Sequence, residues 1–275
     1  MSPEPRALES LLAFWTACGV ETLLSDAPVD RTVVLARAAP APPSPSPRPS
    51  VAKAPPAALP VAAPDAGGVD AEALAQARQA AAAAADLTAL KEAIAAFDGC
   101  ALKPGARQAV FSRGPPDAPL MIIGEAPGGD EDLQGAPFVG RAGQLLDRML
   151  AAAGLADRAF ITNTVFWRPP GNRTPLPAEQ ALCAPFLERA IALVRPRALL
   201  LVGGASAKAM LKTKEGILSL RGRWFEWRSE DGELEIPALP TLHPAFLLRQ
   251  PAAKRKSLEH LLILTERLDR PHRPG

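Results

Sequence analysis

Cysteine is scarce in this 275-residue chain, which contains only Cys18, Cys100 and Cys183. The three residues lie far apart, and an odd number cannot all be paired within one chain. Small secreted scaffolds instead use a dense and usually even set of cysteines. The scarcity therefore argues against a disulfide framework, and we expect a protein of a reducing compartment, the cytoplasm.

Long apolar runs are also lacking, because no stretch approaches the roughly 20 apolar residues that a membrane helix needs. The N-terminus carries Glu4, Arg6 and Glu9 where a signal peptide has a basic tip and an apolar run. We therefore expect neither membrane contact nor a leader. The formal net charge of +2 is small, so any charge that binds nucleic acid has to be local.

Composition divides the chain into three segments. Residues 1–39 contain a short amphipathic helix over 4–18, and residues 40–69 are so rich in Pro, Ala and Ser that we expect an extended linker. Residues 70–275 form the expected folded domain. Its lead-in, 70–97, is alanine-rich and predicted to be helical, with Asp70 and Asp86 as N-caps.

From about residue 100 short apolar runs alternate with helical patterns. The runs 119–123, 160–162, 198–202 and 236–242 are predicted strands, and 138–153, 178–194, 205–211 and 252–268 are predicted helices. Pro185 is expected to kink its helix or to delay the start of it. The alternation indicates an α/β fold in which helices cover both faces of a parallel sheet.

Polar and aromatic side chains follow three of these strands. The first strand is followed by Glu125, Glu131 and Phe138 within a Gly- and Pro-rich run, the second ends at Asn163, and the last leads to His243. Ligands of such sheets bind at the carboxyl ends of the strands. An aromatic face together with an amide is suited to hold a nucleobase by stacking and by hydrogen bonds to its edge. Each cluster alone also fits an ordinary loop, but the three in this order are more specific.

The three clusters together resemble the motifs of family 4 uracil-DNA glycosylases. The resemblance rests on GEAPG at 124–128, Glu131-Asp132, PFVGRAG at 137–143, ITN at 161–163, RPPGNR at 168–173 and HPAFLLR at 243–249. It covers roughly residues 87–268. The family implies a three-layer α/β/α fold with a short central parallel sheet, flipping of uracil out of DNA and hydrolysis of its N-glycosidic bond, as the first step of base excision repair. It also implies a nucleoid-associated enzyme of the bacterial type that acts as a monomer.

The resemblance implies a role for each matching residue. Phe138 stacks on the flipped uracil, the Asn163 amide donates to O4 and accepts from N3–H, and His243 hydrogen-bonds O2 and stabilises the leaving uracil anion. Residues 246–248, Leu247 among them, enter the duplex where the base has left. Phosphate contacts are expected from a set of arginines, namely Arg141, Arg168, Arg173 and Arg249.

The carboxylate assignment stays open between two residues. Glu125 or Glu131 positions or polarises the water, or stabilises positive charge on the sugar. In family 1 enzymes an aspartate and a tyrosine occupy the places of Ala126 and Gly128, so these uracil-binding positions supply neither the water-handling carboxylate nor the thymine block here. Exclusion of thymine is expected to come from elsewhere, with Glu131 as the candidate.

One feature departs from the family. Its members typically hold a [4Fe–4S] cluster on four cysteines, and the corresponding positions here are Phe97, Cys100, Trp167 and Cys183. Neither Phe nor Trp can ligate iron. We therefore expect no intact cluster, an aromatic core in its place, and chemistry that requires no cofactor.

Three other hypotheses compete with this one or accompany it. The turn from Gly203 to Lys208 resembles a phosphate loop but lacks its G-K-[ST] ending, which weighs against a nucleotide-binding enzyme. A DNA-binding module that has lost catalysis is the alternative from a different class. The N-terminal segment is also expected to dock a replication or repair protein, whether or not the domain is catalytic.

Overall fold

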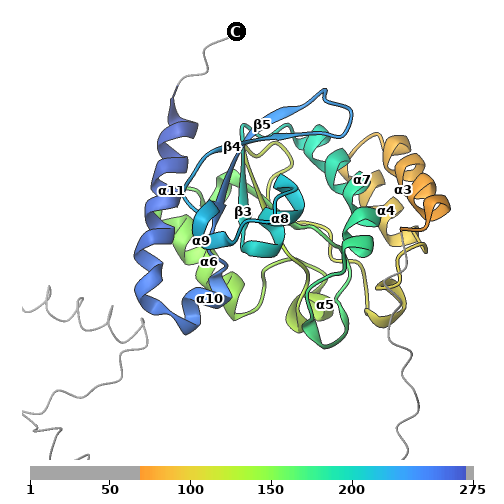
Figure 1. Cartoon of the computed structure of the whole chain (residues 1–275), viewed down its shortest axis with the longest axis horizontal. Coiled ribbons are helices and arrows are strands. Elements are labelled where there is room, and N and C mark those ends of the chain that lie inside the picture. Colours follow the sequence, from red (N-terminus) through yellow and green to blue (C-terminus); the bar gives the residue numbers. More distant parts are fainter. Residues whose placement is uncertain (1–68, 271–275) are drawn as a thin grey trace, which may run out of the picture. The chain divides into compact units, whose positions relative to one another are not determined.

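The structure, a computed structural model, describes residues 69–270, so the predictions for residues 1–39 and for most of 40–69 lie outside the described residues. A five-stranded sheet forms the centre of the described part (Figure 1). Its strands are β1 (Leu120–Gly124), β2 (Ala159–Asn163), β3 (Ala198–Val202), β4 (Phe225–Arg228) and β5 (Glu235–Thr241). The order is β2-β1-β3-β5-β4, and only β4 is antiparallel to its neighbour.

Helices cover both faces of the sheet because its strands are apolar on both sides. On one face Leu120, Ile122 and Leu200 pack against α6 (Arg141–Ala152) and α11 (Lys254–Asp269). On the other face Met121 and Ile123 belong to a larger core with α7 (Pro177–Val194) and α8 (Gly204–Leu211). Figure 1 shows α11 and α6 on one side of the sheet and α7 on the other. The expected three-layer α/β/α fold with a short central sheet is confirmed.

The alanine-rich lead-in forms two helices, α3 (Ala71–Ala83) and α4 (Leu87–Ala96), which lie beside α7 (Figure 1). Both predicted N-caps are confirmed, because the side chains of Asp70 and Asp86 accept hydrogen bonds from Glu72 N and Ala89 N at 3.0 and 2.8 Å. Alanines of α3 face the core shared with α7, which lets the two helices pack closely.

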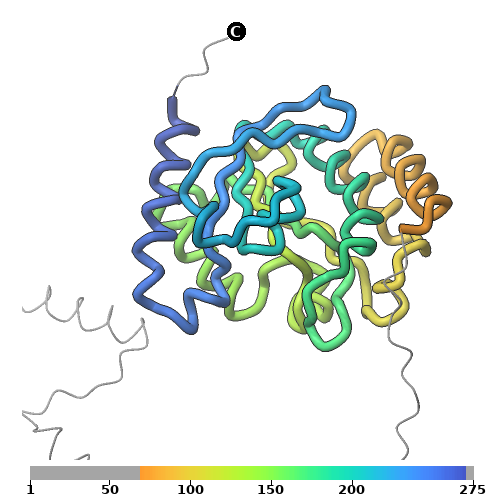
Figure 2. Tube along the Cα trace, in the orientation of Figure 1, coloured from red at the N-terminus to blue at the C-terminus, as the bar shows by residue number. Residues whose placement is uncertain are grey.

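Shorter elements lie in the connections between these strands and helices. They are α5 (Gly129–Gln134), α9 (Ile217–Leu220) and α10 (Pro244–Arg249), with the 3₁₀ turns η1 (Lys103–Gly105), η2 (Ala156–Arg158), η3 (Pro170–Asn172) and η4 (Pro251–Ala253). Figure 2 traces the chain through these turns. None of the helices within 69–270 is long and apolar enough to cross a membrane.

Three sequence-based expectations need correction. The antiparallel edge strand β4 was not predicted. The helix expected from Phe138 begins only at Arg141, because Phe138 has a φ of +55° and cannot be part of a right-handed helix. Of the two effects expected of Pro185, a delayed start is excluded, because α7 begins at Pro177 and contains Pro185 in its interior; the kink stays a prediction.

Candidate active site

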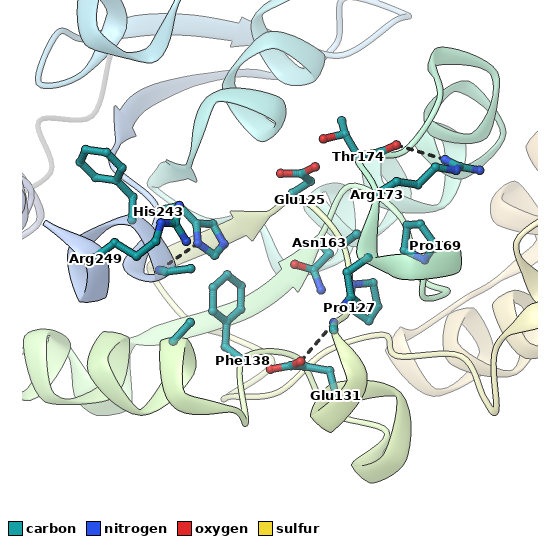
Figure 3. A pocket seen from close by; sticks show the side chains of 16 residues that line it. Glu125, Pro127, Glu131, Phe138, Asn163, Pro169, Arg173, Thr174, His243 and Arg249 are labelled. Carbon is teal, nitrogen blue, oxygen red and sulfur yellow. Dashed lines mark hydrogen bonds between the residues drawn. The ribbon is translucent and has the colours of Figure 1, made fainter. Parts of the chain in front are cut away.

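A pocket of about 630 Å³ opens at the carboxyl ends of β1, β2 and β5 (Figure 3). The site residues predicted from the sequence converge there from all three strand ends. Residues that line it include Glu125, Ala126, Gly128, Glu131, Phe138, Asn163, Arg173, His243, Phe246 and Arg249. The placement follows from the parallel sheet, in which the ends of neighbouring strands meet at one edge.

Asn163 ends β2 at the floor of the pocket and is only 1% exposed. Its Oδ1 atom has no hydrogen-bond partner among the described residues. A buried acceptor without a partner costs roughly 1–3 kcal/mol. The side chain therefore suits a ligand that brings a hydrogen-bond donor into the pocket.

The Phe138 ring stacks against the His243 imidazole, with 5.8 Å between ring centroids and 29° between the planes. A glycine at the end of β1 makes this arrangement possible. A Cβ atom on Gly124 would lie 2.3 Å from Asn163 Oδ1 and 2.6 Å from the Phe138 ring. Because Gly124 has no side chain, the Phe138 ring and the Asn163 amide can both lie against the end of β1.

His243 is the N-cap of α10, and its Nδ1 atom accepts a hydrogen bond from Ala245 N at 3.1 Å. Burial, with repulsion from Arg249, lowers the pKa of His243 from 6.5 to about 4, against the attraction of Glu131. The imidazole is therefore neutral near pH 7. Because Nδ1 is an acceptor, the single proton sits on Nε2, which can donate to a ligand.

Gly203, which the sequence offered as part of a phosphate-loop-like turn, has a different function in the structure. Its φ is +94°, and a Cβ atom there would lie 3.2 Å from His243 Cβ. The turn therefore makes room for the imidazole at the start of α8, a role that the local sequence did not reveal.

The two candidate carboxylates differ in what they contact. The Glu131 carboxylate oxygens accept hydrogen bonds from the backbone N–H groups of Gly128, Val139 and Gly140, with N to O distances of 3.0 to 3.1 Å. The half-buried Glu125 lines the pocket, and its carboxylate forms no hydrogen bond or ion pair with another residue in the described part of the chain. Its backbone is fixed, since Thr164 Oγ1 donates to Glu125 O at 2.6 Å. Glu125 is thus the freer of the two carboxylates.

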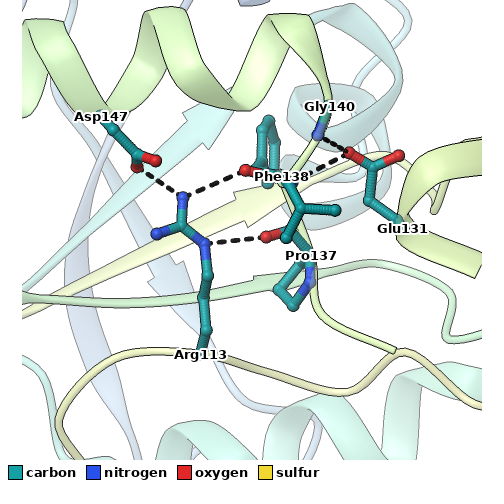
Figure 4. Close-up of polar contacts among 7 residues, drawn as sticks. Arg113, Glu131, Pro137, Phe138, Gly140 and Asp147 are labelled. Atoms are coloured by element: carbon teal, nitrogen blue, oxygen red, sulfur yellow. Dashed lines mark hydrogen bonds and ion pairs between the residues drawn. The ribbon is translucent and has the colours of Figure 1, made fainter. Parts of the chain in front are cut away.

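Arg113, which sequence analysis did not single out, lies beside the turn that carries Phe138 (Figure 4). Its Nε donates to Pro137 O at 2.8 Å and its Nη2 to Phe138 O at 3.3 Å. Nothing in the local sequence connects Arg113 to a residue 25 positions later, so only the folded structure reveals the contact.

The predicted DNA-contacting arginines lie in different surroundings. Arg141 and Arg249 are exposed, and Arg249 lines the pocket. Arg168 donates to Asn172 Oδ1 at 2.7 Å, and Arg173 forms a two-pronged ion pair with the buried Glu179. The latter two arginines therefore also order the loop after β2.

The assignment of Leu247 to DNA requires correction. It is fully buried in a small cluster with Leu145 and Leu242, so it cannot reach a duplex without unfolding α10. Its neighbour Leu248 is 37% exposed, and Phe246 lines the pocket. Within residues 246–248, the side chains that reach the surface or the pocket are therefore these two.

The four positions that the resemblance assigned to cluster ligands lie together in the larger core, which includes Cys183 of α7. Cys100 and Cys183 are both buried, and Phe97 packs against Phe186 and Trp167 at centroid distances of 5.3 and 6.5 Å. Within 69–270 no group of three or more His, Cys, Asp or Glu could hold a metal ion. Two thiols and two aromatic rings do not fit a cluster that needs four thiolates.

The sequence profile of the Uracil DNA glycosylase superfamily matches residues 111–265. The type-4 uracil-DNA glycosylase of Pyrobaculum aerophilum is 39% identical over 174 residues, which are 62% of this chain and 88% of the relative. The type-4 uracil-DNA glycosylase of Sulfurisphaera tokodaii is 40% identical, and the match covers 62% of this chain and 79% of the relative. That of Thermotoga maritima is 35% identical, and the match covers 58% of this chain and 82% of the relative. The chain therefore belongs to the uracil-DNA glycosylase superfamily and, within it, to the type-4 family.

Proposed function

We propose that this protein is a uracil-DNA glycosylase, which flips uracil out of DNA and hydrolyses its N-glycosidic bond to leave an abasic site. The observation that carries the proposal is the buried, unpartnered Oδ1 atom of Asn163 beside the Phe138 ring. Uracil offers the missing donor at N3–H, and its O4 accepts from the amide nitrogen of the same side chain. The aromatic ring supplies the stacking surface.

The same geometry discriminates against cytosine. Cytosine carries an acceptor at N3 and a donor at N4, the reverse of uracil at both positions. Binding it would leave the Asn163 oxygen without a donor and would bury unpaired groups on the base as well. Sites that hydrogen-bond one polar pattern reject the reversed pattern strongly for this reason.

His243 then acts on the leaving group. The neutral imidazole donates from Nε2 to uracil O2, where negative charge develops as the bond between N1 and C1′ breaks. Its orientation is set in advance by the hydrogen bond from Ala245 N to Nδ1. The electron pair of the broken bond leaves with uracil, and water supplies the oxygen that bonds to C1′.

Glu125 is the carboxylate that we assign to water. It positions the attacking molecule, accepts its proton and offsets positive charge on the sugar in the transition state. Glu131 has both oxygens engaged by backbone amides, so we assign it the positioning of the loops around the pocket. A part for Glu131 in excluding thymine stays a prediction.

Contacts with DNA are proposed from exposed groups around the mouth of the pocket. Arg141 and Arg249 neutralise phosphates, and Arg168 and Arg173 hold the loop after β2 close to the backbone. Phe246 and Leu248 occupy the space in the duplex that the base has left.

The decisive experiment is release of free uracil from an oligonucleotide with a single U, followed by alkali cleavage of the abasic site. Oligonucleotides with T or C in its place are the controls. We expect cleavage at U alone, reduced about ten- to hundredfold by Asn163→Ala and about hundredfold or more by His243→Ala. DNA binding without release of any base would contradict the proposal and favour the non-catalytic module.

We propose further that an aromatic core replaces the iron–sulfur cluster of the family. Phe97, Trp167 and Phe186 pack together where the two missing ligands would stand, and the remaining Cys100 and Cys183 are buried next to each other. Burial raises the pKa of the Cys183 thiol, and the hydrogen bond with Cys183 lowers that of Cys100. Iron and sulfide analysis of protein purified without oxygen is the test, and stoichiometric iron would refute the idea.

A further inference from the structure

Phe138 occupies a backbone conformation that a bulky residue rarely adopts. Its φ of +55° lies in the left-handed region, where the side chain of an aromatic residue is disfavoured. Such strain persists only where the surroundings hold the chain in place. The turn also passes close to α6, because a Cβ atom on Gly143 would lie within 2 Å of Phe138 O.

Two charged side chains hold the peptide groups of this turn from opposite sides (Figure 4). Glu131 accepts the N–H groups that follow Phe138, those of Val139 and Gly140, both at 3.0 Å. Arg113 donates to the carbonyl groups of Pro137 and of Phe138 itself. These four hydrogen bonds fix the three successive peptide groups from Pro137 to Gly140 in the orientation that the left-handed turn requires.

Arg113 is itself held by two elements of the fold. Its backbone forms an antiparallel bridge with Ile161 of β2, at 3.0 and 2.8 Å. Its guanidinium reaches Asp147 of α6 at 2.5 Å. Because β2 also carries Asn163, Arg113 connects the aromatic turn to the strand that presents the amide.

We propose that Arg113, oriented by Asp147, is a positioning residue that keeps the Phe138 ring in its stacking orientation over the pocket. The inference deepens the proposed function and rests on it, because the ring is the surface on which uracil stacks. Arg113 acts through the backbone of the turn and contacts neither the base nor the reacting atoms.

A double-mutant cycle tests this assignment. Arg113→Gln is expected to lower the single-turnover rate of uracil release roughly tenfold. Without Arg113 the strained turn can relax and carry the ring away from the base, and the strain of one residue corresponds to a rate factor of about this size. In a Phe138→Ala background the same change is expected to have no further effect, because no ring remains to be positioned. The proposal would be overturned if the fold-losses in rate of the two single variants multiplied in the double variant. It would also be overturned if Arg113→Gln kept the wild-type rate.

Arg158→Gln is the matched control. Arg158 pairs with Asp269 at 2.8 Å and is exposed to a similar degree, but it precedes β2 at the end opposite the pocket. We expect it to leave the rate unchanged. Arg113→Lys keeps the charge but cannot reproduce the forked donation, so a partial recovery of the rate is expected. Thermal unfolding shows which variants are folded, and Arg113→Lys takes the place of Arg113→Gln in the cycle if the latter is not.

A second measurement does not depend on activity. The chain has three histidines, so the proton NMR signals of their rings can be assigned by substitution. The stacked Phe138 ring shifts the signal of His243, and both Phe138→Ala and Arg113→Gln should move that signal in the same direction at pH 7. An unmoved signal in folded Arg113→Gln would overturn the proposal. If the wild type released no uracil, the proposed function would fail while this measurement still decided the role of Arg113.

Discussion

The imidazole of His243 is neutral near pH 7, with its proton on Nε2, because its surroundings set its state. Burial and the nearby Arg249 lower its pKa to about 4, and the backbone of Ala245 occupies Nδ1. An NMR titration of its ring proton is therefore expected to show a midpoint near 4, with no change near the ordinary value of 6.5. A midpoint at 6 or above would mean that the imidazole is charged for part of the working range, and would contradict donation by a neutral ring.

The same shift predicts how stability depends on pH. The unfolded chain binds a proton at this histidine below about 6.5, whereas the folded chain does so only below about 4. The contribution of His243 to stability is thus complete above pH 6.5 and is lost progressively as the pH falls to 4. Chemical denaturation at pH 7 and pH 5 should show a smaller loss of stability for His243→Gln than for the wild type. An equal loss in both proteins would contradict the shift.

Gly124 offers a sharp test of the pocket geometry. In Gly124→Ala the new methyl group would overlap Asn163 Oδ1 and the Phe138 ring, so one of them must move. We expect loss of uracil release by about hundredfold, comparable to removal of the amide itself. Gly105→Ala is the matched control, because nothing lies within 4 Å of its Cβ position, and it should keep full activity. A Gly124→Ala enzyme with the wild-type rate would show that the ring and the amide are not held together.

At the scale of elements, the sequence predicted what local patterns determine. The four parallel strands are short apolar runs buried along most or all of their length, and such runs are recognisable without knowledge of their partners. The edge strand β4 was missed because it is only four residues long and its pairing with β5 is defined only by the fold. The caps Asp70 and Asp86 act within three residues of themselves, so they were predictable.

The candidate site also contains residues that local patterns predicted and residues that only the fold could reveal. Residues at strand ends, such as Asn163 and His243, were found because parallel strands bring their ends together. The left-handed turn at Phe138 was mistaken for the start of α6, since the contacts that impose it come from Arg113 and Glu131. For the same reason Leu247 and Leu248 could not be told apart until the face of α10 was known.

The lead-in helices provide a prediction about stability. Asp86 caps α4 through Ala89 N, and α4 packs on the core that also contains α7. Asp86→Ala is expected to reduce the free energy of unfolding by about 1 kcal/mol, which lowers the melting temperature by roughly 2–4 °C in a domain of this size. Glu92→Ala, at an exposed position of the same helix, should change it little. Equal melting temperatures for the two variants would mean that the cap does not stabilise α4.

At the scale of the whole molecule, recognition and chemistry occupy a limited part of the chain. The pocket residues lie between Glu125 and Arg249, within the 111–265 range shared with the superfamily. The helices α3 and α4 precede that range, yet they belong to the core that holds Cys100, Cys183 and the aromatic rings. These helices therefore stabilise the domain that carries the site.

For the N-terminal segment, residues 1–68, we propose a docking role toward a replication or repair protein. A variant that begins at Val69 keeps the Asp70 cap and all the pocket residues. It is expected to release uracil from a short oligonucleotide at the wild-type rate and to unfold at the wild-type temperature. A matched deletion that ends after Phe97 removes α3 and α4 and should unfold at a lower temperature, because it exposes the apolar side of α7. If deletion of residues 1–68 alone abolished release from short DNA, these residues would act in catalysis or DNA binding, and the docking role would have to be abandoned.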